Sequence, residues 1–243
     1  MLRTLFRWQP DRDTLVAALA GLVVVGLSLA MLPLERWPWA NIIVRDFGQV
    51  FLAGFLFPLL YIHRSGGGFA AFGFSGRKWP LFLAINIVLA ILLFYLMSRA
   101  GPPPANFRWD AATAWKAAYV LLAVSFECLF FYGFLRTLFE RAFGAVAGIA
   151  LAAAFYSLHH AGFQPEFAKL FLVGVMYATI FRLGNSALLI WPFFLGVGGI
   201  YDVLIRSQVV APILHPESRT LGLAVLMAGA VLWSWQRQRA KAL

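Results

Sequence analysis

The chain has 243 residues, of which 62% are hydrophobic and 12% are charged. Soluble domains average about 45–50% apolar and about 25% charged residues, so this composition excludes a soluble globular domain and points to the lipid bilayer as the main surroundings. The formal net charge of +10 comes from 20 Lys and Arg against 10 Asp and Glu. Because the basic residues stand at the ends of apolar runs, they indicate anionic lipids rather than nucleic acid as partners.

Eight apolar segments approach the length of about 20 residues that a helix needs to cross a bilayer. In chain order they cover residues 14–33, 47–63, 79–98, 112–135, 145–160, 166–184, 186–204 and 218–236. The fifth is short, and Pro192 and three glycines interrupt the seventh. The sequence therefore predicts an all-α protein, a polytopic membrane helix bundle of about eight transmembrane helices that forms a single integral membrane domain over residues 1–243.

The N-terminal residues predict how the bundle is oriented. Arg3, Arg7 and Arg12 precede the first apolar run, which continues to about Leu32. That is too long for a typical signal peptide, and no small-x-small cleavage site follows, so an uncleaved first span is expected. When the loops are assigned alternately, 12 of the 20 Lys and Arg fall on the side of the N-terminus. We therefore expect both termini in the cytoplasm, with the chain in a bacterial inner membrane.

Two carboxylates stand well inside apolar runs, Glu127 and Asp202, and His159 and His160 close the fifth segment. A carboxylate in hydrocarbon costs at least about 2.5–3.5 kcal/mol, so it is expected to face the interior of the bundle and to find a partner there. These groups can form one buried polar site or a polar clasp between helices, or they can be helix-end residues that reach water.

Helical geometry favours a shared site. Glu127 lies 17 residues before Gly144 and His159 lies 15 residues after it. If a short turn at Gly144 joins two antiparallel helices, both groups lie about 23–26 Å from that turn. Asp202 follows Ser186, at the start of the seventh segment, by 16 residues, or about 24 Å. The three groups are therefore predicted to share one depth.

The same positions carry a family resemblance. Residues 125–204 resemble the core of the CPBP (Abi) family, which includes the type II CAAX prenyl endopeptidases and the glutamic-type intramembrane proteases called myxosortases. Its motifs are EExxxR, FxxxH, and HxxxN or HxxxD on successive helices. Glu127 matches the first Glu, Phe155 and His159 match FxxxH, and Gly133 matches a glycine that commonly follows the Arg. The family-like core extends over about residues 112–204.

The chain departs from this pattern at three places. Cys128 and Tyr132 stand where the second Glu and the Arg belong, and Gly198 stands where the third motif has its His. Cys128 and Tyr132 are four residues apart, so they are neighbours on a helix and are interpreted as a joint replacement of an ion pair. Asp202 fits the last position of the third motif. His160 is the only apparent substitute for the missing His.

The resemblance implies an endopeptidase that hydrolyses peptide bonds of membrane-anchored or lipid-modified proteins. Glu127 would then activate water, His159 would orient that water or stabilise the oxyanion, and Asp202 would polarise a histidine or hold the substrate. Gly196, Gly198 and Gly199 would let the backbone approach the site, or would serve only for close helix packing. The alternative is a catalytically inactive member of the family, which would act as a binding, chaperone or immunity-type factor.

The same residues allow two other chemistries, a cysteine nucleophile and a metal site. Cys128 is the single cysteine, so there is no internal disulfide, and as a nucleophile it would lie about 100° around the helix from Glu127. A divalent metal has weak support, because HExxH is absent and adjacent histidines on one helix are expected to point apart. No cofactor is therefore predicted.

Overall fold

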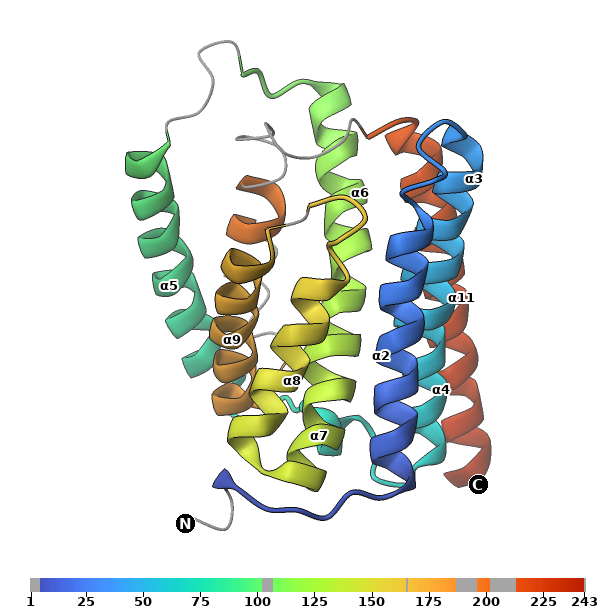
Figure 1. The fold of residues 1–243 in the computed structure, drawn as a ribbon, viewed down its shortest axis with the longest axis vertical. Helices are drawn as coiled ribbons and strands as arrows, with labels where there is room; N and C mark the ends of the chain where they lie inside the picture. The colour runs from blue at the N-terminus through green and yellow to red at the C-terminus, as the bar shows by residue number, and fades with distance from the viewer. Residues whose placement is uncertain (1–4, 102–106, 165, 187–195, 202–212, 243) are drawn as a thin grey trace.

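The computed structural model describes residues 5–101, 107–164, 166–186, 196–201 and 213–242, and within these ranges the chain is helical without strands. The all-α prediction is confirmed. The helices are α2 (Arg12–Ala30), α3 (Pro38–Ile42), η1 (Ile43–Leu56), α4 (Phe57–Arg64), η2 (Phe69–Phe72), α5 (Trp79–Ala100), α6 (Ala111–Glu127), η3 (Cys128–Leu135), α7 (Arg136–Phe143), α8 (Ala145–Leu158), α9 (Phe167–Gly184) and α11 (Pro216–Ala242). They stand side by side in one bundle (Figure 1).

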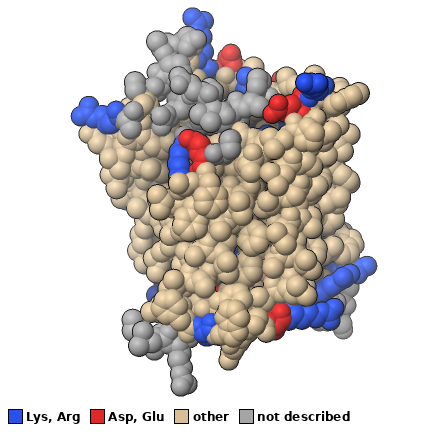
Figure 2. All heavy atoms as spheres, viewed as in Figure 1, with Lys and Arg blue, Asp and Glu red and all other residues tan. Residues whose placement is uncertain are grey.

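Five continuous helices in the described ranges are long and apolar enough to cross a membrane. They are Arg12–Ala30, Pro38–Arg64, Trp79–Arg99, Ala111–Phe143 and Phe167–Gly184. On the face shown in Figure 2, charged residues gather at the two ends, and the wide belt between them is largely free of charge. The chain thus has the build of an integral membrane protein. Eight spans are not confirmed, and most of the segment predicted at 186–204 lies outside the described residues.

The second predicted span begins earlier than hydropathy suggested. α3, η1 and α4 form one continuous helix from Pro38, nine residues before the expected start at 47. This helix therefore contains Asp46, which is 8% exposed and forms an ion pair with Arg219 at 2.6 Å. The sequence places Asp46 just before the second predicted span, whereas the structure places it inside a helix and buries it, because its charge is paired within the bundle.

Residues 111–143 form the central helix of the bundle, and 72% of its apolar stretch is buried. Its middle part, η3, is π-helical and carries the fully buried aromatic side chains Phe130, Phe131, Tyr132 and Phe134. At its end, Gly144 adopts a φ of +88° and leads directly into α8. α7 and α8 pack against each other, which confirms the predicted antiparallel turn at Gly144.

α8 is too short to cross a membrane. Its 14 residues rise about 21 Å, whereas the hydrocarbon core is about 30 Å thick. The chain therefore turns at residues 159–164 within the bundle rather than at its end (Figure 1). Irregular backbone at this depth is tolerated only where it is buried in protein or lines a cavity. The predicted fifth span thus ends inside the protein, with His159 and His160 at its tip.

Candidate functional site

Glu127 lies at the midpoint of the central helix, 16 residues from each end of the 33-residue stretch Ala111–Phe143. It is therefore about 24 Å from either end, near the middle of the bundle. It is the last residue of α6, directly before the π-helical η3, and its residue exposure is only 4%. π-Helical segments occur frequently at functional sites.

The two histidines are oriented by one backbone carbonyl. Nδ1 of His159 and Nδ1 of His160 lie 2.5 and 2.8 Å from the carbonyl oxygen of Tyr156. A carbonyl oxygen only accepts hydrogen bonds, so each Nδ1 must carry a proton and donate it. In the neutral rings, Nε2 is then left with a lone pair, which selects the same tautomer for both histidines.

Glu127 and His159 are in direct contact. His159 Nε2 lies 3.2 Å from Glu127 Oε1, which confirms the predicted closeness of these two groups. The rings of Phe126 and Phe131 hold the imidazole in place, with centroids 5.9 and 4.6 Å from it. Because a neutral Nε2 and a carboxylate oxygen both accept, the pair needs a proton or another cation between them.

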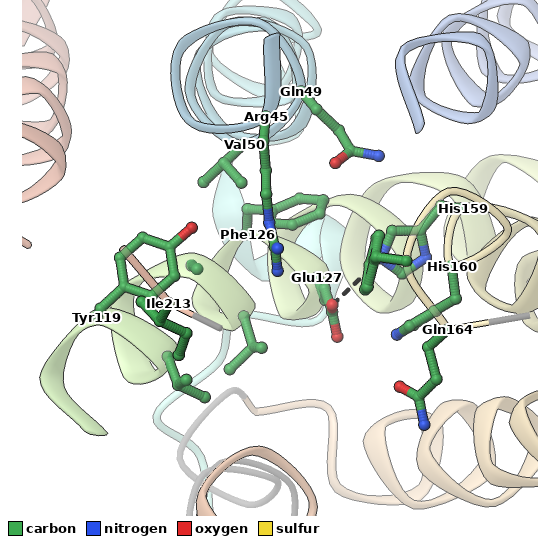
Figure 3. Close-up of a pocket in the computed structure, with 14 residues that line it drawn as sticks. Arg45, Gln49, Val50, Tyr119, Phe126, Glu127, His159, His160, Gln164 and Ile213 are labelled. Atoms are coloured by element: carbon green, nitrogen blue, oxygen red, sulfur yellow. Dashed lines mark hydrogen bonds and ion pairs between the residues drawn. The ribbon is translucent and has the colours of Figure 1, made fainter. Parts of the chain in front are cut away.

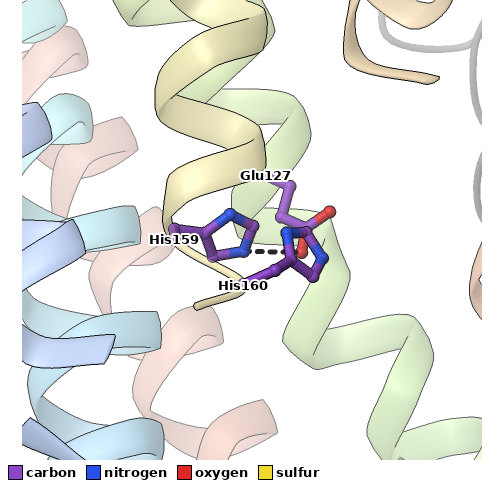
Figure 4. Close-up of side chains that lie close together, drawn as sticks. All are labelled: Glu127, His159 and His160. Atoms are coloured by element: carbon purple, nitrogen blue, oxygen red, sulfur yellow. Dashed lines mark hydrogen bonds and ion pairs between the residues drawn. The ribbon is translucent and has the colours of Figure 1, made fainter. Parts of the chain in front are cut away.

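His160 joins this pair, contrary to the expectation that adjacent histidines point apart. α8 ends at Leu158, so His159 and His160 lie in the turn that follows, where helical spacing no longer separates them. Their ring centroids are 3.9 Å apart (Figure 4). One ligand atom from each of Glu127, His159 and His160 lies within 4.8 Å of the others, so these three residues can hold a metal ion.

A cavity of about 60 Å³ adjoins the three groups (Figure 3). That volume admits at least one water molecule, which needs about 10–15 Å³. Arg45 points from η1 into this cavity, and its guanidinium lies 4.6 Å from the centre of the Phe163 ring. The other polar groups on the wall are Gln49, Tyr119 and Gln164. The cavity therefore brings together a carboxylate, two imidazoles and a cation.

A second cavity of about 260 Å³ also borders Glu127. Val124, Glu127, His160 and Gln164 line both cavities. The larger one extends between α5 and α9, and its walls are mainly apolar. An apolar molecule in this space would reach the polar cluster from the larger cavity, and water would reach it from the smaller one.

The other sequence-predicted site residues lie around the cluster or outside it. Cys128 is 8% exposed in the hydrophobic core and lines neither cavity, which gives no support to its role as a nucleophile. Tyr132 packs near the rings of Tyr156 and Tyr177, and Phe155 stacks on Phe139, away from the pair. Asp202 lies outside the described residues.

Two of the three glycines of the seventh predicted span lie at the site. Gly198 and Gly199 line the larger cavity, whereas Gly196 does not. A Cβ atom on Gly198 would lie 2.6 Å from the hydroxyl oxygen of Tyr177, so only glycine fits there without movement. A Cβ on Gly196 would meet nothing within 4 Å.

Sequence reasoning missed three residues of the site, Arg45, Gln49 and Gln164. The signal was present for the first two, because Arg45, Asp46 and Gln49 form a polar group with helical spacing in an otherwise apolar run. This group coincides with the predicted start of the second span at residue 47, which is why it resembles a loop in the sequence. Gln164 gave no signal, because its place depends on a turn that only the structure shows.

Comparison with models of protein families, with curated proteins and with solved structures found no match.

Proposed function

We propose that the chain is an intramembrane endopeptidase that hydrolyses peptide bonds of membrane-anchored or lipid-modified proteins, as the resemblance to the CPBP family implies. One observation carries the proposal. Glu127 and His159 form a buried pair, 3.2 Å apart, midway along the central helix and beside two cavities. A carboxylate kept there at a cost in stability is expected to serve function.

The arrangement suits general-base hydrolysis. Glu127 takes a proton from a water molecule in the smaller cavity, and the remaining hydroxide attacks the carbonyl carbon of the substrate. When the C–N bond breaks, the proton passes from Glu127 to the amine that leaves. Arg45, whose guanidinium extends into the same cavity, stabilises the negative charge on the carbonyl oxygen. In the pattern of the family this task belongs to a histidine, which Gly198 replaces here.

The larger cavity supports a membrane-embedded substrate. Leu93 and Met97 of α5 and Val173 and Met176 of α9 provide apolar walls that lead to Glu127. An extended segment of a transmembrane or lipid-modified tail is apolar enough to enter, and its peptide bond would meet the polar cluster at the inner end. Among the five apolar helices of the described ranges, α5 is the most exposed, because only 6% of its apolar stretch is buried. This wall therefore adjoins the surrounding lipid.

The hydrolase proposal is tested by replacing Glu127 with Gln, which keeps the volume and removes the base. In the host, membrane proteins from cells that carry E127Q are compared by mass spectrometry with those from wild-type cells. We expect at least one membrane protein to retain a segment that wild-type cells remove, with cleavage slowed by about 10²–10⁴-fold. H63Q, a histidine change outside both cavities, is the control. Identical cleavage patterns in E127Q and wild type would instead favour the non-catalytic alternative.

We also propose that both termini face the cytoplasm of a bacterial cell. The start of α2 and the end of α11 lie at the same end of the bundle, which agrees with termini on one side (Figure 1). The Lys and Arg count supports the cytoplasmic choice. A reporter fused in the loop before Pro216 is expected to report the opposite side of the membrane. A cytoplasmic signal there would contradict this orientation.

A further inference from the structure

We propose that Glu127, His159 and His160 bind one divalent transition-metal ion of the Zn²⁺ class. The ligand set is two imidazole nitrogens and one carboxylate oxygen, which is the set of several catalytic zinc sites. Their ligand atoms lie within 4.8 Å of one another. The separation of 3.2 Å between His159 Nε2 and Glu127 Oε1 is close to the roughly 3.4 Å between two ligands that each lie about 2.1 Å from a tetrahedral ion.

The hydrogen bonds of the imidazoles support a metal independently of these distances. Histidine ligands usually donate the second ring N–H to a carboxylate or a backbone carbonyl, which turns the other nitrogen toward the ion. Here the carbonyl of Tyr156 receives Nδ1–H from both rings. Both neutral histidines are therefore prepared as ligands through Nε2 before any ion arrives.

Burial and charge agree with this assignment. Glu127, His159 and His160 are 4%, 1% and 6% exposed, and buried charges in proteins are paired or bind metals. A bound dication would provide the positive charge that the carboxylate and the two acceptor nitrogens lack. The adjoining cavity of about 60 Å³ leaves room for a water molecule as a fourth ligand.

The ion would also take part in the proposed hydrolysis. This catalytic role rests on the proposed function, whereas binding of the ion does not. Water on a zinc ion loses its proton near neutral pH. One oxygen of Glu127 would bind the ion, and the other would accept this proton before it passes to the amine that leaves. Arg45 and the ion would then both face the carbonyl oxygen of the substrate.

The test is metal binding by the full chain in detergent micelles, measured without substrate. After treatment with a chelator, the protein is titrated with Co²⁺, whose visible spectrum reports the number and kind of its ligands. We expect one equivalent to bind with the spectrum of a four- or five-coordinate site containing nitrogen. Zn²⁺ is expected to displace it and to raise the unfolding temperature.

Variants connect the ion to the three residues. H160Q and E127Q are expected to bind Co²⁺ at least about 10–100-fold more weakly than wild type. H63Q and H215Q, the two histidines outside the cluster, should bind like wild type. Size-exclusion profiles confirm that each variant is folded. Failure of the wild type to bind one equivalent, or unchanged binding by H160Q, would overturn the inference. Full hydrolysis by metal-free protein would refute only the catalytic role of the ion, whereas stoichiometric binding without hydrolysis would refute only the proposed function.

Discussion

The last four backbone carbonyls of a helix have no hydrogen-bond partner within it. The carbonyl of Tyr156 is one of these four at the end of α8. His159 and His160 both donate to it, so they end the helix as well as carrying the chemistry of the site. One backbone atom thus sets the tautomer and the direction of both rings. The remaining ligand atom of the cluster, on Glu127, comes from a different helix, so the site forms only when α6 and the end of α8 are packed together.

At the scale of single residues, the part of Arg45 in catalysis is a prediction. Its guanidinium stacks on Phe163 beside the pair, and it has a role in the proposed mechanism only when charge develops on the substrate. R45Q is therefore expected to lower kcat by about 10²–10³-fold and to leave KM nearly unchanged. The measurement is cleavage of a reconstituted membrane substrate by R45Q, with R99Q in α5 as a control outside both cavities. A change in KM alone would show that Arg45 only binds the substrate.

At the scale of elements, the turn after α8 holds the histidines at the right depth. Gly162 lies against α2, where its N–H donates to the hydroxyl of Ser28 at 3.0 Å. A Cβ on Gly162 would lie 2.0 Å from the backbone oxygen of Ser28, which leaves no space for a side chain. α2 therefore provides the wall against which the turn is folded, although it contributes no residue to either cavity.

G162A tests this role of the turn. The methyl group must push the turn away from α2, because the atom it meets belongs to the backbone and cannot rotate aside. We expect a loss of about 1–3 kcal/mol in the free energy of unfolding, together with loss of metal binding and of cleavage. G26A, in α2 with nothing within 4 Å of its Cβ, is the matched control and should be neutral or slightly stabilising. Equal behaviour of the two variants would contradict this account.

The sequence predicted elements better than it predicted their ends. Long apolar runs and the turn at Gly144 are local properties, so the helices and the closeness of Glu127 and His159 followed from counting residues. The end of α8 inside the bundle did not, because Ala, Phe and Leu continue smoothly to the histidines and only packing shows where the helix stops. For the same reason the expectation that the two histidine rings point apart is wrong, and Arg45 lies inside a helix although it precedes the second predicted span at 47–63.

At the scale of the whole molecule, ion pairs lie toward the two ends of the bundle and the candidate site lies between them. Toward one end, Glu140 of α7 pairs with Arg136 at 2.6 Å and with Arg182 of α9 at 2.8 Å. Toward the other, Asp46 of η1 pairs with Arg219 of α11. The pairs Glu140–Arg182 and Asp46–Arg219 connect different helices, α7 with α9 and η1 with α11. They therefore hold the walls of the site in register without placing further charge in the middle of the bundle.

The final prediction concerns the pair Asp46–Arg219, which joins η1, α6 and α11. Asp46 accepts from Arg219 Nε and Nη2 at 2.6 and 2.8 Å and from the hydroxyl of Tyr119 at 2.7 Å. Both side chains are largely buried, at 11% and 8% exposure. D46A or R219A alone leaves the other charge without its partner and is expected to cost about 3–5 kcal/mol.

The double variant D46A/R219A should cost clearly less than the sum of the two single changes. A coupling energy of about 1–3 kcal/mol in a double-mutant cycle, read from unfolding in detergent, is the expected result. The matched comparison is the pair Glu166–Lys169, whose side chains are 36% and 48% exposed and whose coupling should stay below about 1 kcal/mol. If the two cycles gave the same small coupling, Asp46 and Arg219 would not hold α11 to the bundle. Hydrophobic packing of α11 against α6 would then be its main attachment.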